Sequence, residues 1–171
     1  MARKPQIIDG VVYVPLTRGF VAKLDVCDIE LASDPWIACA SRSDEPPYAR
    51  RRGWPDRSWI HLHREVMKRA GHEIDGFDVD HINRDRLDCQ RTNLRRTRRS
   101  GNCQNTGKKP SQLYKGIFYR QKSGRWIAQI RAGDKKRMHL GCFLSPEAAA
   151  KAYDEAAKKY FGEFACTNGL V

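Results

Sequence analysis

The last third of the chain alternates apolar and polar residues in a pattern that few folds accommodate. Three stretches alternate with a period of two: K-G-I-F-Y-R-Q (115–121), R-W-I-A-Q-I-R (125–131) and K-R-M-H-L-G-C-F (136–143). Short turns, K-S-G and A-G-D-K, separate them. A helix follows, with Ser145 as its N-cap, Pro146 in its first turn and Gly162 at its end. One stripe of this helix is formed by Ala149, Ala152, Tyr153, Ala156 and Tyr160. We predict three antiparallel strands packed on one helix.

Positive charge is concentrated in the middle of the chain. The net charge is +12, but residues 1–49 carry 5 basic and 7 acidic side chains, and residues 141–171 carry 3 and 4. Residues 50–140 carry 24 and 9, and arginine dominates there. A surface that only served solubility would spread its charge, so this concentration indicates a polyanionic partner. Arginine favours phosphate and base-edge contacts, and the predicted partner is nucleic acid.

The rest of the chain predicts small modules. Residues 7–40 show strand signals of a small antiparallel sheet, and 41–57 are typical of a loop or bent strand. A helix is expected over about 60–70, with Leu62, Val66 and Met67 on one face and Gly71 at its end. Short strands are expected at 78–81 and 93–96, then a helix from near Ser100. The linker is placed at 107–113.

Composition excludes several classes of protein. None of the six cysteines forms a C-x-x-C pair, so we expect neither a structural zinc site nor disulfides. No apolar run approaches the length of a membrane span and no signal peptide is visible, so a membrane partner is not expected. We predict a cytoplasmic protein.

An acidic loop in the most basic region raises the question of metal chemistry. Asp80 and His81 lie in F-D-V-D-H-I-N-R-D, directly before a run of arginines. Carboxylates repel a nucleic-acid backbone, whereas hydrolysis of a phosphodiester needs an activated water and a divalent ion. One carboxylate and one amide carbonyl suit Mg²⁺, with Mn²⁺ as the second choice. On a strand the two side chains point to opposite sides, so one can hold metal while the other faces water.

The pattern D-H-x₁₁-N-x₈-N, here Asp80-His81, Asn93 and Asn102, resembles the HNH nuclease motif in the variant with a final asparagine, found in phage and mobile-element homing endonucleases. The resemblance implies two strands and a helix around one divalent ion, a ββα-metal module. His81 would be the general base and Asp80 a metal ligand. Asn93 would orient the imidazole, and Asn102 would be the second ligand, with Asn105 its rival. Taken alone, Asp80-His81 is also typical of a surface turn.

Residues 114–169 resemble the plant ethylene-response-factor (APETALA-type) DNA-binding domain, through Y-K-G-I-F-Y-R, W-I-A-Q-I-R, H-L-G-C-F and E-A-A-A-K-A-Y-D. That resemblance implies a sheet lying in the major groove. The DNA-contacting residues would be Arg120, Lys122, Arg125, Trp126, Gln129, Arg131, Arg137 and His139. Trp126 is alternatively a core residue. Phe118 stands where an arginine is usual and Lys122 near a usual tryptophan, so the plant target sequence does not transfer.

Together these features predict an α+β protein: a β-rich accessory region at 1–59, the HNH module at 60–106, the linker, and the DNA-binding domain at 114–171. The predicted function is a site-selective, metal-dependent DNA endonuclease of a phage or bacterial host, acting on double-stranded DNA as a monomer or weak dimer. The alternative is a DNA-binding transcriptional regulator with an inactive nuclease module. RNA binding is disfavoured because the sheet lacks exposed aromatic pairs.

Overall fold

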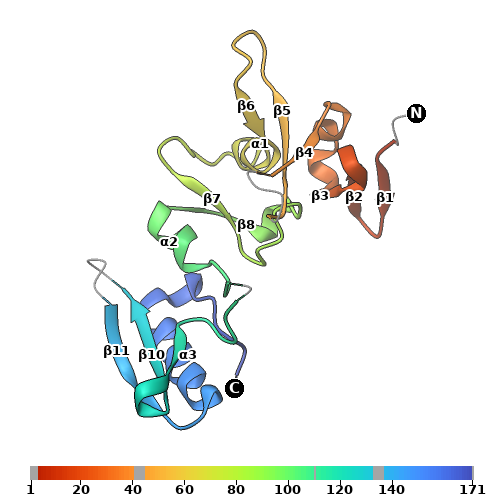
Figure 1. The fold of residues 1–171 in the computed structure, drawn as a ribbon. Coiled ribbons are helices and arrows are strands. Elements are labelled where there is room, and N and C mark those ends of the chain that lie inside the picture. The colour runs from red at the N-terminus through yellow and green to blue at the C-terminus, as the bar shows by residue number, and fades with distance from the viewer. Residues whose placement is uncertain (1–3, 41–44, 110, 133–136, 171) are drawn as a thin grey trace. The chain divides into compact units, whose positions relative to one another are not determined.

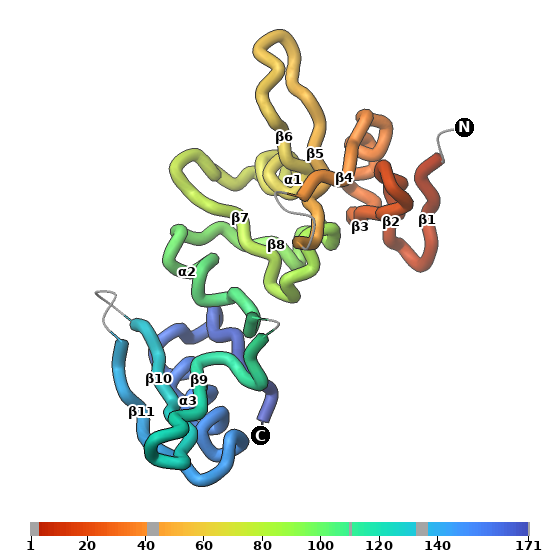
Figure 2. The backbone as a smooth tube through the Cα atoms, viewed as in Figure 1, coloured from red at the N-terminus to blue at the C-terminus, as the bar shows by residue number. Residues whose placement is uncertain are grey.

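The chain folds as two units, Met1–Arg99 and Ser100–Val171. The computed structural model describes residues 4–40, 45–109, 111–132 and 137–170. Most of the turn predicted at 132–135 and one residue of the predicted linker, 110, lie outside these ranges. Figures 1 and 2 show the elements of each unit, coloured along the chain. Among the helices in the described ranges, none combines the length and the apolar character that crossing a bilayer requires.

The first unit contains three small antiparallel sheets. Strands β1 (Gln6–Ile8), β2 (Val11–Pro15) and β3 (Val21–Asp25) form one sheet in that order. Strands β4 (Ile37–Cys39), β5 (Tyr48–Arg52) and β6 (Trp59–His61) form the second. Strands β7 (Asp78–His81) and β8 (Leu94–Thr97) form the third. The sequence predicts residues 36–40 as part of the first sheet, but Ile37–Cys39 pairs with β5 instead.

Helical segments connect these sheets. The 3₁₀ segments are η1 (Thr17–Gly19), η2 (Val26–Ser33) and η3 (Arg91–Asn93). Helix α1 (Leu62–Arg69) lies within the predicted range, and Leu62, Val66 and Met67 are all buried, as predicted. Its C-terminus turns at Gly71, whose φ is +82°, and His72 N donates to Met67 O at 3.0 Å.

One hydrophobic core serves the whole first unit. It joins Val12 and Leu24 of the first sheet, Ala49 of the second, Val66 of α1 and Val79 of β7. The predicted domain boundary between residues 59 and 60 therefore falls within a region that shares one hydrophobic core. Sheets of two or three short strands bury too little apolar surface alone, so a shared core is the physical expectation.

The second unit has the predicted sheet and helix. Strands β9 (Ile117–Arg120), β10 (Arg125–Arg131) and β11 (Arg137–Phe143) pair antiparallel in the order β11-β10-β9. Helix α3 (Pro146–Phe161) packs on them, and Ser145 Oγ accepts from Ala148 N at 3.2 Å. The short elements are α2 (Arg99–Gln104), η4 (Gln121–Ser123) and η5 (Gly162–Phe164).

The predicted stripe of α3 is right except at its end. Ala149, Tyr153 and Ala156 are buried, whereas Tyr160 is 47% exposed and Phe161 is buried in its place. Ala150, Ala157 and Phe161 are buried as well, so the buried face of α3 is displaced around the helix axis from the predicted stripe and Tyr160 falls at its edge in the last turn.

Candidate nucleic-acid interface

One face of the β9–β11 sheet carries basic side chains in cross-strand pairs. The pairs are Arg120 with Arg125, Gln129 with His139, and Arg131 with Arg137. Residues paired across antiparallel strands share a face, and positions two apart on β10 do so too. Except for the half-buried Gln129, these six side chains are exposed. The structure therefore brings six of the eight predicted DNA-contacting residues onto one surface, which we call the open face.

Helix α3 covers the other face of this sheet. Ile130 lies in one cluster with Tyr153 and Ala157, and Met138 and Leu140 pack against it. The alternation of β10 that buries Ile130 is what leaves Gln129 and Arg131 outward. A β-bulge in β11 at Leu140 shifts the register, since Ala128 pairs with Gly141 and Gln129 with His139.

The open face is electrostatically uncompensated. Arg120, Arg125, Arg131 and Arg137 make no ion pair with a carboxylate of the described residues, and neither does Lys122 in the η4 turn. Like charges opposite one another on a sheet destabilise the free protein. Phosphates that bind this face neutralise the repulsion, which makes the free energy of binding more favourable.

Trp126 differs from the other predicted contact residues. It is half-buried and packs against the cluster of Ile117, Ala128 and Ala149, on the α3 side of the sheet. Its ring centroid lies 5.2 Å from that of Tyr119. Of the two roles left open by the sequence, this packing favours the core role.

The predicted metal ligand Asp80 is held by an arginine. Asp80 on β7 pairs in register with Arg95 on β8. Arg95 Nε and Nη2 lie 2.9 and 2.8 Å from Asp80 Oδ2. Both side chains are largely buried, so the guanidinium balances the carboxylate charge where a divalent ion would have to.

The predicted base His81 is buried among other rings. Its ring centroid lies 5.0 Å from that of His63 and 6.0 Å from that of Tyr48, and only 4% of the residue is exposed. Burial lowers the pKa of His81 from 6.5 to about 4, and the charge of nearby carboxylates, Asp80 first, offsets only part of that shift. The imidazole is neutral at physiological pH.

Asn93 ties the β7–β8 loop together. Its Oδ1 accepts from Asn83 N at 3.0 Å and its Nδ2 donates to Asp88 O at 2.8 Å. Both ends of the amide thus bind backbone of the loop, which fixes the chain on either side of the turn.

The asparagines predicted as second ligand belong to the other unit. Asn102 and Asn105 follow Ser100, whereas Asp80 belongs to Met1–Arg99. Asn105 is 6% exposed and Asn102 is half-buried. Asp80 is bound by Arg95, and the Mg²⁺ site that the motif implies stays a prediction.

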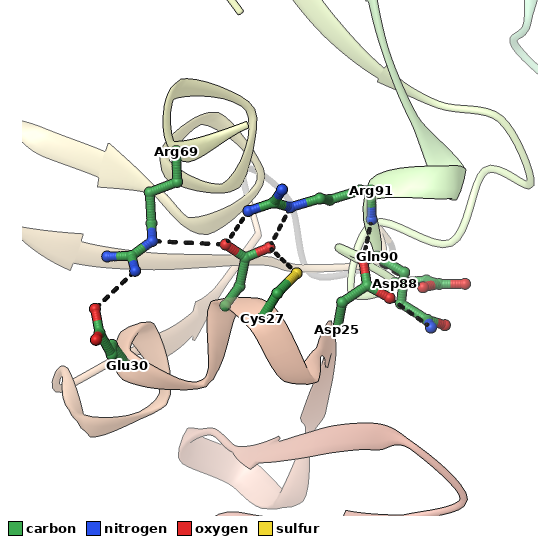
Figure 3. Close-up of polar contacts among 8 residues, drawn as sticks. Asp25, Cys27, Glu30, Arg69, Asp88, Gln90 and Arg91 are labelled. Carbon is green, nitrogen blue, oxygen red and sulfur yellow. Dashed lines mark hydrogen bonds and ion pairs between the residues drawn. The ribbon is translucent and has the colours of Figure 1, made fainter. Parts of the chain in front are cut away.

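A second acidic group is likewise taken up by arginines. Ligand atoms of Asp25, Cys27 and Asp28 lie within 4.8 Å of one another. The fully buried Asp28 carboxylate accepts from Arg91 Nε and Nη2, each at 2.8 Å, and Arg69 Nε lies 3.6 Å from it. Figure 3 shows Arg69 and Arg91 at this group. The group links η2 to α1 and η3, and its carboxylates already have cationic or backbone partners, so it stabilises the fold.

Comparison with known proteins bears on the second unit. The AP2 domain family matches residues 112–163. A protein of Oryza sativa subsp. japonica named for its AP2/ERF and B3 domains is 48% identical over 63 residues, covering 37% of this chain and 19% of that protein. The AP2-like ethylene-responsive transcription factor ANT of Arabidopsis thaliana is 42% identical over 59 residues (34% and 11%). Dehydration-responsive element-binding protein 2E of rice is 46% identical over 57 residues (32% and 17%).

The chain spans less than a fifth of the length of each of these relatives. The plant-type resemblance is confirmed for residues 112–163, and nothing among these similarities supports the HNH resemblance of residues 60–106. The prediction of an endonuclease is wrong: the matching family is the AP2 domain, and these relatives are named as a transcription factor and an element-binding protein rather than as nucleases. Their plant origin also conflicts with the predicted phage or bacterial host.

Proposed function

We propose that this chain is a DNA-binding transcriptional regulator that lays the open face of its β9–β11 sheet in the major groove of double-stranded DNA. The observation that carries the proposal is the set of exposed, uncompensated cations on that face, opposite a face sealed by α3. The names of two relatives, a transcription factor and an element-binding protein, support it.

The dimensions of the sheet suit the groove. Neighbouring strands lie about 4.8 Å apart, so three strands span roughly 10 Å between outer backbones. The major groove of B-DNA is about 12 Å wide and admits β-strands as well as helices. The side chains of the middle strand, β10, would then reach the base edges, while those of the turns would lie near phosphates.

The residue types divide into two kinds of contact. Arg131 and Arg125 suit the O6 and N7 acceptors of guanine, and Gln129 suits adenine. Phe118 lies on the same face, because it pairs with Ile127 of β10, and it is 39% exposed. A ring at this position suits a thymine methyl group, so the target differs from sites read by an arginine there. Lys122 in the turn would hold phosphate.

The test compares two single-charge variants of the full chain. Arg131→Ala removes a cation from the open face, and the matched control Lys151→Ala removes one from the exposed side of α3. Binding is measured by fluorescence anisotropy on duplexes selected from a random pool. We expect Arg131→Ala to weaken selected-site binding by about 1–3 kcal/mol, and Lys151→Ala to change it little. Equal, small effects of both variants would refute the open face as the contact surface.

A further inference from the structure

The β5–β6 hairpin in the first unit exposes a second group of basic and aromatic side chains. In register, Arg50 pairs with His61, Arg51 with Ile60 and Arg52 with Trp59. The Arg51–Ile60 side faces inward, since Ile60 packs on the core and Arg51 Nε lies 3.1 Å from Asp34 Oδ2. Alternation therefore places Arg50, Arg52 and Trp59 together on the outer face.

These outer side chains are held in a fixed arrangement. The Arg52 guanidinium lies 3.7 Å from the centroid of the Trp59 ring and that of Arg50 lies 4.8 Å from it. Arg52 Nη1 also donates to Arg57 O at 2.8 Å, across the turn. Stacking and hydrogen bonding reduce the freedom that these side chains would lose on binding a ligand.

The hairpin carries positive charge without matching carboxylates. Among the described residues, no acidic side chain pairs with Arg50, Arg52 or Arg57. The one carboxylate of the turn, Asp56, accepts from Ser58 N at 3.1 Å and so serves the turn itself. Arg52 and Arg57 are exposed and thus offer their remaining donors to an anion, whereas Arg50 is half-buried and its Nη2 donates to Cys39 Sγ.

The β5–β6 turn carries an exposed tryptophan. Trp54 is 86% exposed, the most of any large apolar side chain in the described part of the chain. Figures 1 and 2 show the β5–β6 turn extending beyond the other elements of the first unit. Single exposed apolar residues are ordinary, but this one is at a projecting turn flanked by arginines, where the described residues cover little of it.

We propose that the β5–β6 hairpin is a second DNA-contacting element, in which Arg52 and Arg57 bind backbone phosphates and Trp54 inserts at a base step of the duplex. Apolar side chains inserted in this way partly unstack the step and bend the DNA, and nearby cations hold the bent backbone. The charge excludes a basic partner and favours a polyanion. The choice of DNA as that polyanion rests on the proposed function.

The experiment uses the full chain and a mixed-sequence duplex of about 30 base pairs carrying a fluorophore at each end. Anisotropy gives affinity and end-to-end energy transfer gives bending. Trp54→Ala should weaken binding roughly 5- to 100-fold, the range for loss of one aromatic–base stack, and should reduce bending. Trp54→Phe should restore most of both. Arg52→Ala should lower the slope of log K against log salt by about 1.

Lys68→Ala is the matched control, because it removes one exposed cation from α1 of the same unit rather than from the β5–β6 turn. Its affinity should stay within about twofold of the original chain. Trp54→Ala with unchanged affinity, or with lost affinity but unchanged bending, would overturn the insertion. If Arg131→Ala still loses selected-site binding in that case, the proposed function stands and only the hairpin role falls. A chain that binds no duplex at all would overturn both.

Discussion

Gly116 should be the least replaceable residue of the second unit. It precedes β9 with φ +78°, a backbone region that L side chains rarely adopt. A Cβ built there would lie 2.0 Å from Tyr153 Cδ2, 2.2 Å from Tyr153 Cε2 and 2.9 Å from Gln129 O. The ring of Tyr153 belongs to the core under the sheet and is 4% exposed, so it cannot swing into solvent without opening that core.

The expected cost of Gly116→Ala has two parts. The left-handed backbone costs a non-glycine residue about 1–2 kcal/mol. Relieving the overlap must move Tyr153 or the β9 backbone, and overpacking of this kind costs about 1–3 kcal/mol. The sum, roughly 2–5 kcal/mol, compares with a total of about 4–10 kcal/mol for a unit of roughly 70 residues. The variant should therefore lose a large share of this unit's stability, which speeds the exchange of β10 amides that open by global unfolding.

Gly124→Ala is the control. Gly124 also has a positive φ, +60°, but the nearest atom to its added Cβ is Tyr119 Oη at 3.8 Å. It should lose only the backbone part, about 1 kcal/mol. Hydrogen exchange measured by mass spectrometry on the full chain separates the units, because peptides from β10 report the second unit alone. Equal protection of β10 in the two variants would refute the argument that the Tyr153 contact, rather than the turn, demands glycine.

Three further predictions concern titration, a buried clamp and metal. Burial lowers the pKa of His81 from 6.5 to about 4, so the unfolded chain binds a proton at this histidine more tightly than the folded chain does. The free energy of unfolding of the first unit should therefore fall by up to about 3 kcal/mol as the pH drops from 6.5 to 4. In urea melts, His81→Gln should flatten this pH dependence. The Asn168 side chain joins two segments: its Nδ2 donates to the buried Asp154 carboxylate at 2.8 Å, and its Oδ1 accepts from Lys115 N at 2.6 Å. Asn168→Ala removes both bonds but keeps the backbone bond of Asn168 N to Asp154, and it should cost roughly 3 kcal/mol, seen as faster exchange at β9; unchanged exchange would contradict the clamp. At matched ionic strength, DNA affinity should be the same in EDTA as in Mg²⁺. Supercoiled plasmid incubated with the protein and Mg²⁺ should stay intact; Mg²⁺-dependent nicking would show that the Asp80–Arg95 pair opens for metal.

The second unit could be predicted closely because its signals are local. The alternation of residues 125–131 matches β10 at both ends, and the Ser145, Pro146 and Gly162 positions match the caps of α3. Capping and period-two patterns depend on neighbours within a few residues, so a single sequence contains them. The open face follows from the same alternation once the position of α3 is known.

The first unit could be predicted less well because its determinants are long-range. Nothing local indicates that Ile37–Cys39 pairs with β5 rather than with the sheet before it, since either pairing satisfies the alternation. The partner of Asp80 is likewise set by strand register: Arg95 lies 15 positions away and becomes its neighbour only when β7 and β8 pair. The motif spacing alone predicted Asp80 as a metal ligand, whereas the pairing of β7 with β8 places it in an ion pair with Arg95.

The same hairpin shows why a motif spacing can mislead. A loop between two short strands needs its backbone fixed, and Asn93 does this with hydrogen bonds to Asn83 and Asp88. A buried strand residue with a carboxylate needs a cation, which Arg95 supplies. These requirements of folding account for two of the four residues in D-H-x₁₁-N-x₈-N without any reaction, so the spacing carries less information about chemistry than its length suggests.

Two basic surfaces on separately folded units lead to one last prediction. If the open face and the β5–β6 hairpin contact the same duplex, the chain between them makes the second contact intramolecular, and each contributes to a single binding free energy. The losses from Arg131→Ala and Trp54→Ala should then add within about 0.5 kcal/mol in the double variant, because the two residues share no partners. If each unit instead bound its own duplex, Trp54→Ala would leave the affinity for a selected site unchanged, and a stoichiometry of two duplexes per chain would appear at saturation.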